Sequence, residues 1–199
     1  MQGFPADRKA DTYGDGSLTS PTLWWADLGG YGAWVPKWND GTTSTNNREE
    51  ASYFGPAIGQ KGTSTRMELM AWIRVLAIPC RSLYATDSAS MLGKALHLLR
   101  KAKEVEQKEE ACEKVSKRNP YKKAWGLQKD GGRWELAWPA IIKRGASNQA
   151  IRKVKGHATS ADIAEGRCNQ KDKEGNDKAD EIADIGVLQI KVKGLVTLG

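Results

Sequence analysis

Four acidic residues stand in short, separate sequence contexts: Asp15 in YGDGSL, Glu68 in STRMELMAW, Asp87 in YATDSA and Asp180 in GNDKADEIA. Each lies at the edge of a predicted strand or helix. Folds build divalent-metal sites from carboxylates distributed in this way, because hard cations such as Mg²⁺ prefer oxygen ligands. Two such ions close together can hold the attacking and leaving oxygens of a phosphodiester. The set therefore predicts metal-dependent chemistry on a phosphodiester.

Each acid taken alone has an ordinary structural explanation. Asp15 precedes a glycine, as turn aspartates often do. Glu68 lies in the first turn of a predicted helix, where the helix dipole favours a negative charge. Asp87 can cap the helix that follows it, and Asp180 lies on an acidic helical face. Only the four together, in this order, make the structural explanation improbable.

With the segment KVKGHA, which holds His157, these motifs resemble the ribonuclease H type 1 family, nucleases that cut the RNA strand of an RNA/DNA hybrid. The resemblance extends from about Tyr13 to about Gly186, and RMELMA around Glu68 is its sharpest single match. It implies an α/β fold with three layers, in which helices flank a mixed five-stranded sheet. It also implies an endoribonuclease that leaves a 5′ phosphate.

The resemblance further implies a role for each residue of the set. Two Mg²⁺ ions, for which Mn²⁺ is a substitute, would be held by the carboxylates, with Asp15 bridging both. Asp180 would complete the ion that activates water, while Glu68 and Asp87 would hold the ion at the leaving 3′ oxygen. His157 would act in proton transfer or product release.

Substrate contacts follow from the same resemblance. Lys61 and Thr63 match positions that hold a phosphate of the DNA strand, whereas Asp130 stands where the family usually has an asparagine. The basic and aromatic segment near Trp125 resembles a handle that grips the hybrid. The residues expected to bind substrate are Lys61, Thr63, Ser64, Trp125, Lys122, Lys123 and Lys155. Residues 158–175 are longer than in compact bacterial members, and we expect a flexible insert there.

Composition supports a nucleic-acid partner. The chain of 199 residues carries a formal charge of +7, a balance that favours polyanions. Two stretches, 114–129 and 143–155, contain several lysines and arginines and no aspartate or glutamate. The three cysteines lack metal-ligand spacing and predict free thiols. With no signal-peptide core and no apolar run long enough to span a bilayer, we expect an intracellular monomer of the cytoplasm or nucleus.

Hydrophobic periodicity predicts the elements that must position the set. Strands are expected at 10–18, 30–38, 51–58, 81–87 and 149–156. Helices are expected from 65 to 78 with Thr65 as N-cap and Pro79 after it, from Ser88 to just before Asn119, from 134 to 143 and from 176 to 186. The tail is strand-like. We expect one domain over 1–199, with a core at about 10–187, a basic handle at about 100–130 and an unplaced tail at 188–199.

Two other functions stay open. A domain of this fold that has lost catalysis would bind nucleic acid without cutting it. A nuclease domain of a retroelement polyprotein would keep the chemistry in a larger protein. The first alternative would be marked by a missing carboxylate, and all four are present.

Overall fold

The computed structural model describes residues 10–19, 28–37, 49–57, 63–78, 81–114 and 117–196. Lys61, Pro79 and the connection at 40–47 lie outside these ranges. Five strands form one sheet in the order β3-β2-β1-β4-β5. Their bounds are Thr12–Thr19 for β1, Leu28–Val35 for β2, Ala51–Ala57 for β3, Ser82–Thr86 for β4 and Gln149–Lys153 for β5.

The sheet is mixed. Strands β1, β2 and β3 are antiparallel neighbours, whereas β4 runs parallel to β1 and β5 runs parallel to β4. Because β4 is parallel to both β1 and β5, the carboxyl ends of β4 and β5 lie together, and the end of β4 lies beside the middle of β1. Side chains that follow these strands are therefore brought together, although they are far apart along the chain.

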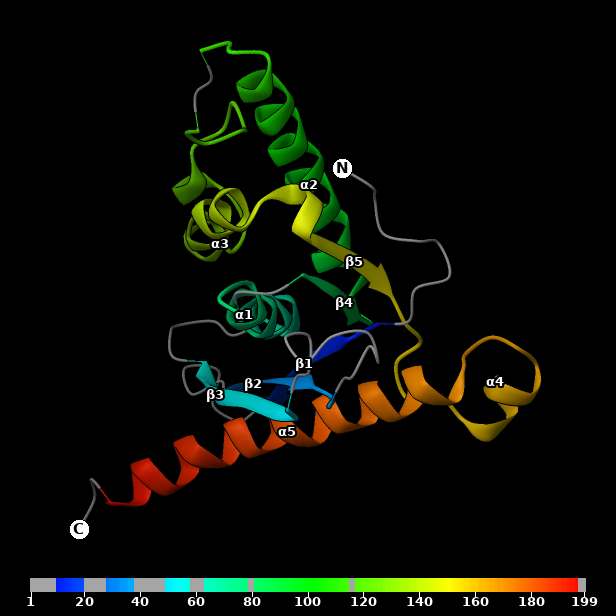
Figure 1. The fold of residues 1–199 in the computed structure, drawn as a ribbon. Helices are drawn as coiled ribbons and strands as arrows, with labels where there is room; N and C mark the ends of the chain where they lie inside the picture. The colour runs from blue at the N-terminus through cyan, green and yellow to red at the C-terminus, as the bar shows by residue number, and fades with distance from the viewer. Residues whose placement is uncertain are drawn as a thin grey trace.

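Helices cover both faces of the sheet (Figure 1). On one face lie α1 (Ser64–Leu76), α2 (Ala89–Glu110) and α3 (Gly131–Arg144), and on the other lies α5 (Gln170–Val196). A short helix, α4 (Ser160–Ala164), precedes α5, and two 3₁₀ turns span Trp125–Leu127 and Ala146–Asn148. The three-layer architecture predicted from the motif order is confirmed.

The two faces have separate apolar clusters. The larger cluster joins the sheet to α1, α2 and α3, and it buries Trp72, Trp134 and Trp138, as their helical spacing predicts. The smaller cluster lies under α5 and includes Tyr13, Ala85 and Ala179. Within the described ranges, no helix is long and apolar enough to cross a membrane.

Helix boundaries follow local capping. Ser88 caps α2 as predicted, its hydroxyl accepting from the N–H of Met91 at 3.4 Å. The N-cap of α1 is Thr63 and not Thr65, because the Thr63 hydroxyl accepts from the N–H of Arg66 at 3.1 Å. The prediction that α2 continues to residue 118 is also wrong. It ends at Glu110, and Cys112 adopts a left-handed φ of 58° that an α-helix does not accommodate.

The last third of the chain differs most from expectation. The prediction of a strand-like tail is wrong, since α5 is continuous from Gln170 to Val196. The flexible insert at 158–175 is wrong as well, because that segment holds α4 and the first turn of α5. A capping box, in which Thr159 and Asp162 bond reciprocally, begins α4.

Candidate active site

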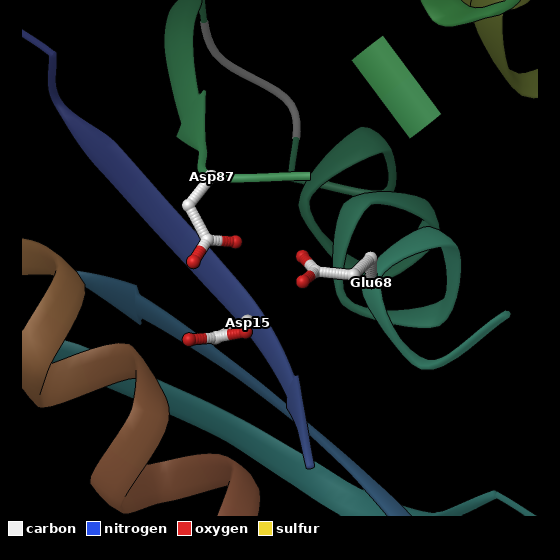
Figure 2. Close-up of side chains that lie close together, drawn as sticks. All are labelled: Asp15, Glu68 and Asp87. Carbon is white, nitrogen blue, oxygen red and sulfur yellow. The ribbon is translucent and has the colours of Figure 1, made fainter. Parts of the chain in front are cut away.

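Three carboxylates from different elements converge beside the middle of β1, where β4 ends (Figure 2). Asp15 projects from β1 and Glu68 from α1, and Asp87 is the residue that directly follows β4. Each offers an oxygen that lies within 4.8 Å of those of the other two. Asp15 and Glu68 are buried and Asp87 is half-buried. The structure therefore assembles three of the four acids that the sequence singled out.

Close packing of α1 on β1 brings Glu68 to Asp15. A β-carbon on Gly16 would lie 2.3 Å from Cβ of Met67 and 2.5 Å from the main-chain nitrogen of Glu68. Only a glycine leaves room for the helix at this distance. The N–H of Gly16 also donates to Oδ1 of Asp15 over 2.6 Å, which orients that carboxylate.

Two residues beside the acids hold them in place. The Thr86 hydroxyl donates to Oε2 of Glu68 over 3.2 Å. Asp87 is approached by Gly156, where a β-carbon would lie 2.1 Å from Oδ2 of Asp87. The sequence did not single out Thr86, although a threonine directly before the predicted acid in a fully buried strand was a usable signal.

Crowding of negative charge perturbs the acids. Burial, followed by the charge of Asp87, raises the pKa of Asp15 to about 6. Burial, followed by the charges of Asp15 and Asp87, raises the pKa of Glu68 well above its ordinary value. Three carboxylates at this spacing repel one another, and a divalent cation would relieve that repulsion. An all-oxygen donor set of this kind fits Mg²⁺ or Mn²⁺.

The fourth acid, Asp180, lies on α5 next to the group but outside its tight spacing. Its charge contributes to the raised pKa of Asp15. Its own pKa is raised by burial and by Asp184, and is lowered by His157. The glycine at residue 32 lets α5 lie close to the sheet, since a β-carbon there would lie 2.5 Å from the carbonyl oxygen of Ala179. Asp180 therefore borders the cluster from the opposite face of the sheet.

His157 lies on the same side of the site. It is exposed and follows Gly156 in a turn, with a left-handed φ of 47°. Because its charge acts on Asp180, the imidazole is near the carboxylates and open to solvent. The segment after His157, where a flexible insert was expected, contains α4, which begins three residues later.

Tyr84 is a site neighbour that the sequence did not single out. Its side chain is fully buried in β4, and its hydroxyl has no hydrogen-bond partner among the described residues. Burial raises its pKa well above the ordinary value, and the charges of Glu68, Asp15 and Asp87 raise it further. The phenol therefore lies beneath the carboxylate cluster.

The expected phosphate contacts are only partly visible. Thr63 caps α1, and its hydroxyl also donates to Oδ2 of Asp130 at 3.4 Å. Asp130 forms an ion pair with Arg66, with Nε to Oδ1 at 2.9 Å. Ser64 is exposed at the start of α1. The carboxylate of Asp130 thus already engages the hydroxyl that was expected to hold a phosphate.

A lysine of α2 lies over aromatic rings next to the segment predicted as a basic handle, about 100–130. Nζ of Lys94 lies 4.9 Å from the ring centre of Trp134, 5.7 Å from that of Trp125 and 5.4 Å from that of Tyr121. Trp125 is only 7% exposed, so its ring packs in the core and does not offer a face to a stacked base, contrary to expectation. The expected substrate residues Lys122, Lys123 and Lys155 are exposed.

Comparison with known proteins rests on structure. No family of known sequences and no curated protein matches the chain. The protease–reverse transcriptase of prototype foamy virus matches with a TM-score of 0.57 and 18% identity, over 92% of this chain and 22% of that one. The chain thus spans about a fifth of the length of that viral protein.

Two shorter structures match equally well. The ribonuclease H domain of prototype foamy virus has a TM-score of 0.56 and 21% identity, over 92% of this chain and 98% of that domain. LC9-RNase H1, a type 1 ribonuclease H with the type 2 active-site motif, has a TM-score of 0.55 and 16% identity, over 92% of this chain and 74% of that one. The chain therefore has a ribonuclease H-like fold.

Proposed function

We propose that the protein is a metal-dependent endoribonuclease that hydrolyses the RNA strand of RNA/DNA hybrids. The observation that carries this proposal is the convergence of Asp15, Glu68 and Asp87 within 4.8 Å of one another. The fold shared with two ribonucleases H supports it. The formal charge of +7 suits a polyanionic substrate.

The side chains have separate tasks in this proposal. Asp15, Glu68, Asp87 and Asp180 would hold two Mg²⁺ ions, with Mn²⁺ as substitute. When bound, such ions supply an activated water and stabilise the charge on the leaving 3′ oxygen, which leaves a 5′ phosphate. Thr86 and the N–H of Gly16 hold Glu68 and Asp15 in place through their hydrogen bonds. Exposed His157, close to Asp180, is positioned to carry a proton to or from solvent.

Selection of the RNA strand needs a contact that DNA cannot make. The 2′ hydroxyl is the group that distinguishes RNA from DNA at a given position. Glu68 on α1 is the carboxylate proposed to sense it, with Oε2 held by the hydroxyl of Thr86. The substrate would be gripped further by Lys122, Lys123 and Lys155, which are exposed.

The test is cleavage of an end-labelled RNA/DNA hybrid with Mg²⁺ by wild type, Asp87→Asn and Asp177→Asn. Asp177 is exposed on α5 outside the cluster, so its variant makes the same change of charge elsewhere. Asp87→Asn should lose more than the roughly 10–100-fold that removal of a ligand's neighbour costs. Asp177→Asn should keep the wild-type rate. Equal rates for wild type and Asp87→Asn would refute the assignment.

A second candidate is a binding module without catalysis. It is favoured by the position of Asp180, which borders the tight group without joining it. The same assay separates the two, because a module would bind the hybrid tightly with no turnover in either Mg²⁺ or Mn²⁺. The match to part of a viral protease–reverse transcriptase supports a further proposal, that the domain belongs to a retroelement polyprotein.

A further inference from the structure

A cavity of about 750 Å³ lies beside the carboxylate cluster, between the end of β5 and the corner that joins α4 to α5. We call it the β5–α5 basin. Its lining residues are Arg152, Lys153, Val154, Lys155, Gly156, Gly166, Arg167, Cys168, Asn169 and Asp172. Half of this lining comes from the segment at 158–175, which holds α4 and the start of α5.

Positive charge dominates the lining. Four of the lining residues are cations and one, Asp172, is an acid. The carboxylate of Asp172 accepts three hydrogen bonds, from Arg152 at 2.6 Å, from the hydroxyl of Tyr13 at 3.2 Å and from Asn169 at 2.6 Å. Its charge is thus compensated inside the protein by these contacts.

The cations differ in how far acids compensate them. Arg167 is bonded to Asp162 and Glu165, and Lys155 lies 3.6 Å from Asp162. Lys153 instead donates to the main-chain oxygen of Asp87 over 3.1 Å, a neutral acceptor that leaves its charge uncompensated by that contact. Lys153 is exposed. It is the lining cation best placed to meet an anion.

The outer wall of the basin is held in shape by buried acids. Asp162, 4% exposed, caps α4 with Thr159 and accepts from Nε of Arg167 over 2.8 Å. The carbonyl oxygen of Asp162 accepts from the N–H of Arg167 at 2.8 Å and of Cys168 at 3.2 Å. These bonds fix the turn between α4 and α5 without a ligand. Binding a ligand therefore costs little conformational entropy in this turn.

The basin is continuous with the carboxylate cluster. Gly156 lines it and also lies against Asp87, where a β-carbon would be 2.1 Å from Oδ2. Lys153 lines it too and bonds the main chain of the same aspartate. Lys153 would therefore lie next to a strand held at Asp87.

We propose that the β5–α5 basin binds phosphate groups of the nucleic-acid strand that is held at the carboxylate cluster. These phosphates are the neighbours of the phosphate at the cluster, and Lys153 is their main contact. The proposal rests on the proposed function, whose substrate it extends on the side of His157. Contacts to phosphate carry no sequence information. The basin therefore adds affinity and fixes the direction of the strand without adding base preference.

The experiment measures binding of a fluorescein-labelled RNA/DNA hybrid by anisotropy over a range of salt, with Ca²⁺ in place of Mg²⁺ to suppress cleavage. The variant is Lys153→Gln. The matched control is Lys143→Gln, also an exposed lysine, in the last turn of α3 before the start of β5. Since β5 has five residues, it spans about 16 Å, and the control lies at the far end of that strand. Thermal melting verifies that both variants fold.

The slope of log K against log salt is negative, and loss of one phosphate contact should reduce its magnitude by about 0.9. We expect that decrease for Lys153→Gln, with severalfold weaker binding at low salt, and no decrease for Lys143→Gln. Hybrids shortened stepwise from each end give a second readout. Shortening from the end that covers the basin should weaken binding to wild type but not to Lys153→Gln.

The outcomes separate the two proposals. Equal slopes for Lys153→Gln and wild type would overturn the basin, even if the hybrid is cut. Absence of cleavage in Mg²⁺ and Mn²⁺ together with the expected change in slope would refute the nuclease and leave the basin intact. Equal decreases of the slope in Lys153→Gln and Lys143→Gln would also overturn the basin, because the effect would then reflect net charge alone.

Discussion

The hydroxyl oxygen of Tyr84 lies 1.9 Å from the point that a β-carbon on Gly14 would occupy. Gly14 directly precedes Asp15 in β1, and Tyr84 lies in the neighbouring strand β4, where it is fully buried. The absence of a side chain at residue 14 thus makes room for the phenol that forms the floor beneath the carboxylates. The position of Asp15 depends on this contact.

Gly14→Ala should therefore destabilise the protein. The added methyl group would lie 1.9 Å from the hydroxyl oxygen of the buried Tyr84, an overpacking that costs about 1–3 kcal/mol. Chemical denaturation measures the change in the free energy of unfolding. Gly93→Ala is the matched control, because a β-carbon there meets nothing within 4 Å. Within α2 it should stabilise by up to about 1 kcal/mol, so a stable Gly14→Ala variant would contradict the packing.

Tyr84→Phe removes only the hydroxyl. That group is buried and has no hydrogen-bond partner among the described residues, so it carries a desolvation cost of about 1–3 kcal/mol. The variant should be as stable as wild type or more stable. The free energy of unfolding in denaturant again gives the result. A loss of stability beyond about 1 kcal/mol would mean that the hydroxyl is bonded.

The pH dependence of stability has a definite sign at Asp15. Its pKa is raised in the folded protein from 3.8 to about 6, so the native state binds more protons than the unfolded state between these values. The stabilising contribution of protonated Asp15 to the free energy of unfolding is fully present below about pH 4, and it is lost as the pH rises through about 6. In metal-free protein, Asp15→Asn should therefore gain stability relative to wild type over this window.

Denaturation in EDTA at a series of pH values measures this difference between Asp15→Asn and wild type. Taking the difference cancels the other titrating groups that the two proteins share. A difference that stays constant from pH 4 to pH 7 would contradict the raised pKa of Asp15.

Divalent cations should stabilise the folded protein. A ligand that binds only the native state adds about 2.7 kcal/mol at a hundred times its dissociation constant. Mg²⁺ or Mn²⁺ should therefore raise the melting temperature of wild type and of Asp177→Asn. Asp15→Asn should show little increase, because Asp15 belongs to the tight group. Removal of the metal with EDTA should reverse the increase, and a similar response in Asp15→Asn would argue against this site.

Local patterns in the sequence predicted much of the fold. Alternation marked the strands, and Ser88 marked the start of α2, because these signals act over a few residues. The tail was misread because isoleucine and valine between polar residues favour a strand by propensity. In the structure α5 already packs along the sheet, and Gly186 fits against the carbonyl oxygen of Gly55, so tertiary packing overrides propensity.

The site was predictable where the acids lie in recognisable motifs, and less so where long-range pairing decides. Asp15, Glu68 and Asp87 were selected in advance. Tyr84 was not, because its contact with Gly14 exists only after β1 and β4 pair in register. Trp125 lies beside lysines in the sequence, yet it is buried in the core, where its ring contacts Tyr121 and the ammonium group of Lys94, a residue far earlier in the chain.

One uninterrupted helix carries three fixed points of the molecule. Asp172 near the start of α5 is bonded to Tyr13 of the sheet, Asp180 borders the carboxylates, and Gly186 rests against β3. A straight helix rises 1.5 Å per residue and resists bending, so these points cannot shift separately. Ile185 and Leu188 are exposed further along it. Because these side chains share one helix with Asp180, a shift of α5 at Ile185 and Leu188 would also shift Asp180.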